Sequence, residues 1–464
     1  MDRWLVVVAA LAGCGDNSSG RPETAGIRDG TRLVARLRIA DGASVFSGWH
    51  DTVREVDCQF QPASDGEYRC LPTGLDVSFA NYRYADAACT QQVVFGTRCH
   101  PPRYAFGPEM ATARCNKPSG RAVFSVGAAL TSRNVFSYED GVCSPSSVPE
   151  GDAAYDLGDK LPATDFVSAQ LGPTTSDPLA PYAFTAEDGA IEAVTTWDAA
   201  RGGECDVRDR IDQPRCVPIE IALHYDHVWA DAACTIQAAV DLSPVRPCTR
   251  PTAIAGFGSD GFNFREIGAS VPVADVHVTD MANVCKPADR TNTAEGDDYY
   301  LEGPIIPDDQ FPLLTRVLDG TGRLRAERYT DAAGNQLAAA RGFYDTLTEN
   351  RCSPNRFPDG TLRCVPHNAG YASAPRSGGY FADAACTQPV GIEQATSPPP
   401  SAIVVAHASR DACDAVLYDA VHAAGPPHTG AVFLGVECAP AVRDPNLTYY
   451  TLGAPIELPQ ITER

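Results

Sequence analysis

The sequence lacks the signatures of several large protein classes. None of its 17 cysteines forms a Cys-x-x-Cys pair, which argues against structural zinc. Basic residues number 37 against 59 acidic ones, for a net charge of −22, which disfavours nucleic acid as a partner and leaves no polybasic patch for anionic lipid. The chain also has no nucleophile elbow, phosphate loop, dinucleotide fingerprint or His-Glu-x-x-His motif. No catalytic residue or reaction is therefore predicted.

The amino-terminal residues are typical of an exported lipoprotein. An apolar run from Trp4 to Leu11 ends in Leu11-Ala-Gly-Cys14, and it is too short to span a bilayer. Residues 1–13 are predicted to be a signal peptide, Cys14 the lipidated residue and residues 14–30 a flexible tether. No later stretch is long and apolar enough to cross a membrane, so the lipid would be the only anchor. The alternative is a buried strand or short helix ahead of a cytosolic domain.

The chain contains an internal repeat. The hexapeptide Ala-Asp-Ala-Ala-Cys-Thr occurs at 85–90, 230–235 and 382–387, each time after an aromatic residue. Cys58, Cys205 and Cys352 follow one another at intervals of 147 residues. Such self-similarity predicts three copies of one structural unit, with boundaries at 31–180, 181–318 and 319–464.

The cysteines follow the repeat, as disulfides of an oxidising compartment would. Sixteen remain after Cys14, and four per copy are common to all three copies. The remaining cysteines are uneven, since the second copy adds Cys248 and the third Cys413, which leaves either a bridge between these copies or free thiols. Local bridges are predicted for three pairs: Cys58 with Cys70, Cys205 with Cys216, and Cys352 with Cys364.

An all-β fold is expected. Short segments rich in β-branched and aromatic residues alternate with Asp-Gly turns, such as Asp41-Gly42, and no long helical period is present. Two arrangements fit copies of this length. One is a six-bladed propeller-like assembly, favoured because no Pro- or Ser-rich linker separates the copies and because closure protects sheet edges. The other is three tandem disulfide-rich β-sandwich domains.

The repeated aspartates are the main candidates for a conserved task within the chain. Because a catalytic carboxylate is needed once rather than three times, capping of turns is predicted for Asp86, Asp231 and Asp383. One calcium ion per copy is the alternative, although the dense Asp spacing of calcium loops is missing. His224 and His227 would point to opposite faces of a strand and so would not bind one metal ion. The acidic cluster around Glu295 and Asp297 is interpreted as a loop.

Arg-Cys-x-Pro recurs at 69–72, 215–218 and 363–366. These steps, the lipobox Leu11-Ala-Gly-Cys14 and the hexapeptides together resemble uncharacterised lipoproteins of myxobacteria and related Gram-negative bacteria, over residues 31–460. That family carries no assigned activity, so the resemblance implies a location on the outer membrane or cell surface and no catalytic residue. We expect a non-enzymatic envelope scaffold for an unidentified ligand. The alternatives are a carbohydrate-active enzyme, which should bring together polar residues unmatched between copies, and a purely structural envelope protein.

Overall fold

The computed structural model describes residues 26–80, 83–107, 120–139, 141–149, 151–208, 213–241, 251–258, 261–280, 283–288, 298–340, 342–372, 379–395, 397–406, 418–435 and 437–464. Every regular element in these ranges is a β-strand or a short 3-10 helix, so the predicted all-β class is confirmed. Within the same ranges, no helix has the length and apolar character that a membrane span requires.

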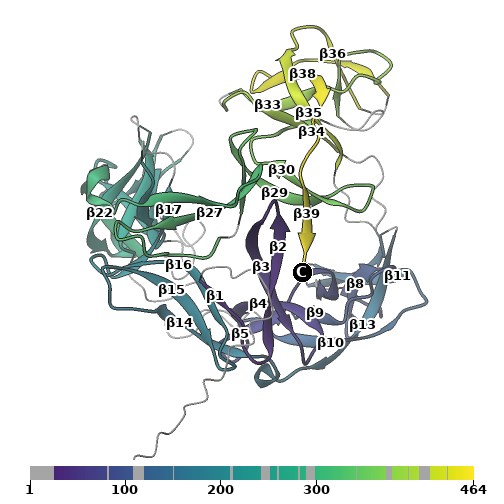
Figure 1. Ribbon diagram of the computed structural model, residues 1–464, viewed down its shortest axis with the longest axis horizontal. Coiled ribbons are helices and arrows are strands. Elements are labelled where there is room, and N and C mark those ends of the chain that lie inside the picture. Colours follow the sequence, from purple (N-terminus) through teal and green to yellow (C-terminus); the bar gives the residue numbers. More distant parts are fainter. Residues whose placement is uncertain are drawn as a thin grey trace, which may run out of the picture.

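One sheet of 16 strands joins the first halves of all three copies (Figure 1). Each copy contributes a unit of four antiparallel strands: β2–β5 form the first unit, β15–β18 the second and β27–β30 the third. Strands β14 and β39 lie between units, β26 extends the third unit beyond β27, and β1 pairs with β16. The strands are β1 (Ile27–Arg28), β2 (Leu33–Ala40), β3 (Ala43–Asp51), β4 (Val56–Pro62), β5 (Tyr68–Pro72), β14 (Ser168–Pro173), β15 (Leu179–Ala186), β16 (Ile191–Asp198), β17 (Gly203–Arg208), β18 (Arg215–Pro218), β26 (Thr315–Asp319), β27 (Leu324–Thr330), β28 (Phe343–Asp345), β29 (Asn350–Arg356), β30 (Leu362–Pro366) and β39 (Gln460–Glu463).

Linking segments close the three units into a ring. Strand β14 pairs with β5 and β15, and β39 pairs with β30 and β2. Between the second and third units, an isolated bridge joins Arg215 to Leu313, just ahead of β26. The same backbone bond recurs at each junction, since the N–H groups of three equivalent cysteines donate to linking-segment carbonyls: Cys70 to Val167 at 2.9 Å, Cys216 to Pro312 at 3.0 Å and Cys364 to Pro459 at 3.1 Å.

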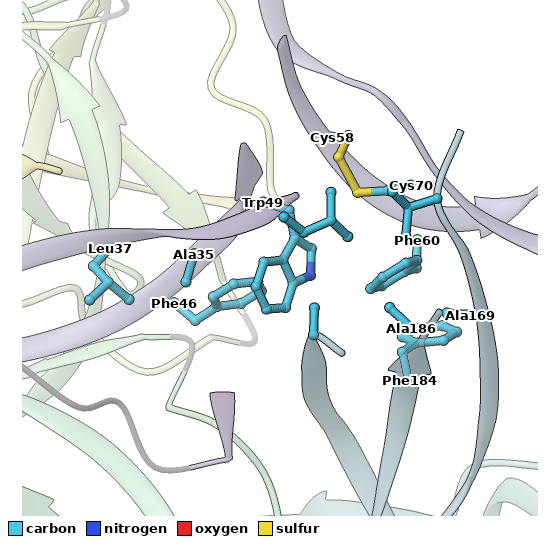
Figure 2. Packing of buried hydrophobic residues seen from close by; sticks show 13 residues of the cluster. Ala35, Leu37, Phe46, Trp49, Cys58, Phe60, Cys70, Ala169, Phe184 and Ala186 are labelled. Carbon is cyan, nitrogen blue, oxygen red and sulfur yellow. A yellow bond between two sulfur atoms is a disulfide. The ribbon is translucent and has the colours of Figure 1, made fainter. Parts of the chain in front are cut away.

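The units also interlock through their hairpins. The second unit's hairpin tip packs Phe184 and Ala186 against Trp49 and Phe60 of the first unit in one core cluster (Figure 2). At the turn of this hairpin, the Asp188 carboxylate accepts the backbone N–H groups of Arg32 at 3.0 Å and Leu33 at 2.7 Å. A second core cluster joins the first unit's hairpin tip to the third unit. The units of the ring therefore share core clusters that lie between the copies.

The second half of each copy forms a separate lobe, and the three lobes surround the ring (Figure 1). The first lobe is an eight-stranded sheet, the second has seven strands, and the third contains a closed five-stranded barrel with a three-stranded sheet. The first lobe comprises η1 (Gly74–Asp76), β6 (Val77–Phe79), β7 (Arg83–Tyr84), β8 (Gln92–Thr97), β9 (Tyr104–Phe106), β10 (Val123–Ala129), β11 (Asn134–Glu139), β12 (Val142–Ser147), β13 (Asp152–Lys160) and η2 (Ala163–Asp165).

The other two lobes have comparable strand content. The second comprises β19 (Ile221–Trp229), β20 (Gln237–Asp241), β21 (Ala253–Gly258), β22 (Gly261–Val271), η3 (Val273–Asp275), β23 (His277–Thr279), β24 (Cys285–Pro287), β25 (Asp298–Ile305) and η4 (Asp308–Gln310). The third comprises β31 (Gly370–Ala372), β32 (Tyr380–Phe381), β33 (Gly391–Gln394), β34 (Ala402–Ala406), β35 (Tyr418–Pro427), β36 (Val432–Leu434), β37 (Ala439–Ala441) and β38 (Leu447–Pro455).

This arrangement differs from both expected architectures. The units of the ring are joined edge to edge by hydrogen bonds, whereas propeller blades are separate sheets around a channel, so the described strands do not form six blades. Nor do they form three independent sandwich domains, because the copies share one sheet and its cores. The expected tether also ends earlier than residue 30, since Ile27 and Arg28 are paired in β1.

Candidate functional site

The repeated hexapeptide forms the same corner in every lobe. In the first lobe, the Asp86 carboxylate accepts the N–H groups of Ala88 at 2.9 Å and Gln91 at 2.6 Å, and the Thr90 hydroxyl at 3.1 Å. Asp231 and Asp383 accept equivalent bonds from the threonines at their own corners. The N–H bond from Gln91 leads the groups that hold the pKa of Asp86 below its ordinary value. These carboxylates accept bonds within their turns, and calcium binding stays an untested alternative.

The cysteine of each corner has an unusual backbone conformation. Cys89, Cys234 and Cys386 have φ values of 52°, 51° and 50°, in the left-handed region that costs an L-residue about 1–2 kcal/mol. A related turn shows the relaxed alternative. Asp331 caps the hairpin between β27 and β28 with the same bonds, and Gly334, at φ 87°, occupies the position of the corner cysteine.

Disulfides hold both halves of each copy. In the ring, the structure joins the three predicted pairs, each with a Cα–Cα distance of 5.2 Å: Cys58–Cys70, Cys205–Cys216 and Cys352–Cys364. In the lobes, each corner cysteine bonds to the cysteine near the end of its own copy: Cys89–Cys143, Cys234–Cys285 and Cys386–Cys438. Cys99 is disulfide-bonded as well. Cys14, Cys115, Cys248 and Cys413 lie outside the described residues.

Asp51, Asp198 and Asp345, which also recur at intervals of 147 residues, lie buried at turns of the ring. Asp51 forms a two-bond pair with Arg32 at 2.8 and 2.6 Å and caps the N–H of Val53 at 3.0 Å. Asp345 repeats this arrangement with Arg323 and Leu347, while Asp198 pairs with Arg201 at 3.2 Å. All three side chains serve the fold, because their oxygens are used by the local turn and its arginine.

The two histidines and the adjacent tyrosines Tyr299 and Tyr300 of the second copy lie on strands of the second lobe. His224 Nδ1 contacts the buried carboxylate of Glu302, whereas the exposed His227 lies beside Tyr225, with ring centroids 5.5 Å apart. Tyr299 and Tyr300 are buried in the second lobe. Glu295 and Asp297 lie outside the described residues.

One Ser–His contact in the third unit was not expected from the sequence. Ser353 Oγ lies 2.6 Å from His367 Nε2, and burial, followed by the charge of Arg351, lowers the pKa of His367. A nucleophilic pair needs a third group that orients the histidine through its other nitrogen. Nδ1 has no such partner in the part of the chain that the structure describes, so we assign this pair no catalytic role.

Three positions of the ring are equivalent in register but differ in chemistry. The cross-strand pair His50–Asp57 corresponds to Trp197–Glu204 and to Tyr344–Arg351. The position diagonal to this pair, on the preceding strand, is occupied by Arg36 in the first unit, Tyr182 in the second and Glu327 in the third. The first unit therefore carries Arg36 paired with Asp57, and the second carries Tyr182 stacked on Trp197, with ring centroids 5.3 Å apart. The third reverses the charges of the first, with Glu327 bonded to Arg316 and Arg351.

At the charged patch of the first unit, the structure has a cavity of about 710 Å³. Strands β2 to β4 form one side, and η1 and the residues before it form a wall. Glu463 of β39 and Arg464, which follows this strand, complete the lining. Arg36 Nε donates to Asp57 at 2.9 Å, and Arg38 Nε donates to Glu463 at 2.9 Å. The cavity is lined by Arg36, Arg38, Ser47, Gly48, Asp57, Cys58, Gln59, Thr73, Gly74, Leu75, Asp76, Glu463 and Arg464.

The pocket residues were missed by sequence reasoning because that reasoning followed what repeats. The signal that could have identified them is a difference between the copies, since Asp57 of the first unit and Arg351 of the third occupy equivalent positions and carry opposite charges. None of the described lining residues forms a nucleophile–base pair, since the Ser47 hydroxyl donates to the Arg36 carbonyl at 3.1 Å.

A protein-family model matches residues 6–244 and 314–462. The chain belongs to DUF7481, a family of unknown function. The DUF7481 match covers the ring and includes every pocket residue except Glu463 and Arg464, while much of the second lobe lies outside it. No curated protein and no solved structure matches the chain. Membership of DUF7481 and the disulfides together agree with a stabilised extracellular or envelope protein.

Proposed function

We propose that this DUF7481 protein is an exported, lipid-anchored binding protein of the Gram-negative cell envelope and that the pocket of the first unit is its ligand site. The observation that carries the proposal is the ion pair Arg36–Asp57 of the pocket, which the other units do not repeat. The same positions hold Tyr182 and Glu204 in the second unit and Glu327 and Arg351 in the third. A framework role alone would not require such a difference. The cavity of about 710 Å³ falls in the range of small-molecule sites, roughly 300–1,000 Å³.

Blocking the pocket should abolish ligand capture. We expect purified wild-type protein, incubated with the low-molecular-mass fraction of a Gram-negative periplasmic extract, to carry a bound compound in native mass spectrometry. Ser47→Trp should lose it, because an indole would fill the cavity beside Arg36. Val53→Trp adds the same side chain at an exposed turn position outside the lining and should retain it. Equal adducts on all three proteins would contradict the proposal.

The anchor rests on the Leu11-Ala-Gly-Cys14 motif and on the export that the disulfides imply. Cys14→Ser is expected to abolish labelling by a fatty-acid analogue and to move the protein from the membrane to the soluble fraction. The reason is that all the acyl chains of the proposed anchor are attached to Cys14. Ser18→Ala, in the same polar segment, should leave both unchanged. Membrane retention of the unlabelled Cys14→Ser protein would refute lipid anchoring.

A further inference from the structure

We infer that the pocket binds a small zwitterion, with the ligand carboxylate on Arg38 and its ammonium group on Asp76. This rests on the proposed function, because it assumes that the pocket is the ligand site. The three arginines and three acidic side chains of the lining balance in charge, in a chain whose net charge is −22. Two of the acids are already bonded to arginines, so the unbonded groups decide what the site can recognise.

Arg38 is held in position while its binding edge stays available. Its Nε donates to Glu463 at 2.9 Å, and its two terminal nitrogens have no partner among the described residues. A guanidinium fixed in this way presents two parallel N–H donors, the geometry that matches a carboxylate. Arg464 adds a second cation to the lining, and its backbone is fixed by bonds to Leu37 in both directions, each 2.9 Å long.

Asp76 supplies the opposite charge on the wall of the pocket. Its backbone is fixed, because its carbonyl accepts the Arg103 N–H at 2.9 Å within the segment that contains η1. Its half-buried carboxylate has no bonding partner in the part of the chain that the structure describes. A carboxylate in this setting is stabilised by a ligand cation or hydrogen-bond donor.

The remaining lining favours a peptide-like zwitterion over a sugar acid. None of the described lining residues is aromatic, so a pyranose ring has no apolar ring face on which to stack. Gln59, Ser47 and Thr73 offer the donors and acceptors that peptide amides need. The fixed arginine fork and the separate carboxylate therefore suit the two ends of a short peptide.

Isothermal titration calorimetry with trialanine tests this assignment. Wild-type protein should bind trialanine, and Arg38→Met and Asp76→Asn should each weaken binding about tenfold or more, as loss of a charge-assisted hydrogen bond does. Arg356→Met, an exposed arginine of β29 outside the pocket, is the control and should not change the affinity. On the wild-type protein, trialanine amide and N-acetyl-trialanine should each bind about tenfold more weakly.

The capped peptides keep the test independent of variant folding. Each cap should also remove the effect of its matching substitution. Trialanine amide should bind the wild-type protein and Arg38→Met with equal affinity. N-acetyl-trialanine should bind the wild-type protein and Asp76→Asn with equal affinity. Equal binding of free and capped peptides, or binding of trigalacturonate instead, would overturn the zwitterion assignment. If Ser47→Trp still blocks capture of another compound, the proposed function stands without this inference. If Ser47→Trp changes nothing, both are wrong.

Discussion

Replacing Asp345 by alanine is expected to lower the free energy of unfolding by about 3–5 kcal/mol, the cost of breaking a buried ion pair. The Asp345 side chain is 0% exposed and accepts two bonds from Arg323, at 2.8 and 2.6 Å, and the Leu347 N–H at 2.9 Å. The substitution leaves the guanidinium and the turn N–H without their acceptor. Because the third unit pairs with the first through β39, the loss of stability should extend to the whole ring.

Denaturant unfolding of the variant provides the measurement, with Asp319→Ala as the matched control. Asp319 also pairs with an arginine, Arg328, but its side chain is 48% exposed, and exposed pairs contribute only about 0–1 kcal/mol. Acid supplies a second readout of the same contact. Burial acts to raise the pKa of Asp345, but hydrogen bonds and charge from Arg323, with the Leu347 N–H, outweigh it and lower the pKa.

The sign of the acid effect follows from that direction. A carboxylate whose pKa is lower in the folded state stabilises the fold above the unfolded value, about 4, and loses this contribution as the pH falls through the folded pKa. Wild-type protein should therefore lose stability below about pH 4, and Asp345→Ala should lose less over the same range. If Asp345→Ala is as stable as Asp319→Ala and loses as much stability in acid as the wild-type protein, the Arg323–Asp345 pair does not stabilise the ring.

Local features of this fold were predictable because they depend on neighbouring residues. Asp41-Gly42 and Asp188-Gly189 form the expected hairpin turns, and the short spacing of Cys58 and Cys70 corresponds to adjacent strands β4 and β5. The ring was not predictable, because it depends on pairings between strands far apart in sequence. Strand β39 inserts between β2 and β30, and the sequence of residues 460–463 does not indicate that it pairs with either strand.

The candidate site was hidden for a related reason. A repeat makes shared residues conspicuous, and here the shared residues build turns, staples and buried arginine pairs. The pocket depends on what the first unit does not share, namely Arg36 and Asp57 where the third unit has Glu327 and Arg351. Three equivalent backbones can thus remain stable while the side chains between them diverge, because the support of each unit lies in the residues that stay the same.

The corner disulfides should carry the second large effect. Replacing Cys89 and Cys143 by alanine removes a bridge across a sequence separation of 54, worth roughly 4 kcal/mol in the chain-entropy model. The companion variant, with glycine at Cys89 and alanine at Cys143, should lose about 1 kcal/mol less, because φ 52° costs alanine energy that glycine avoids. Gly334, at φ 87° in the equivalent Asp331 turn, is the precedent within the chain.

Denaturant unfolding of the two double variants measures the contribution of the disulfide and the cost of the left-handed backbone. Thr90→Val is the control, because it removes a hydrogen bond of the corner and keeps the disulfide. The bridge and the backbone conformation act on different states: the disulfide restricts the unfolded chain, whereas the left-handed residue raises the energy of the folded one. Their effects should therefore be separable. If the alanine and glycine variants prove equally stable, the corner cysteine bears no conformational cost. If both match the wild type, the staple does not stabilise the lobe.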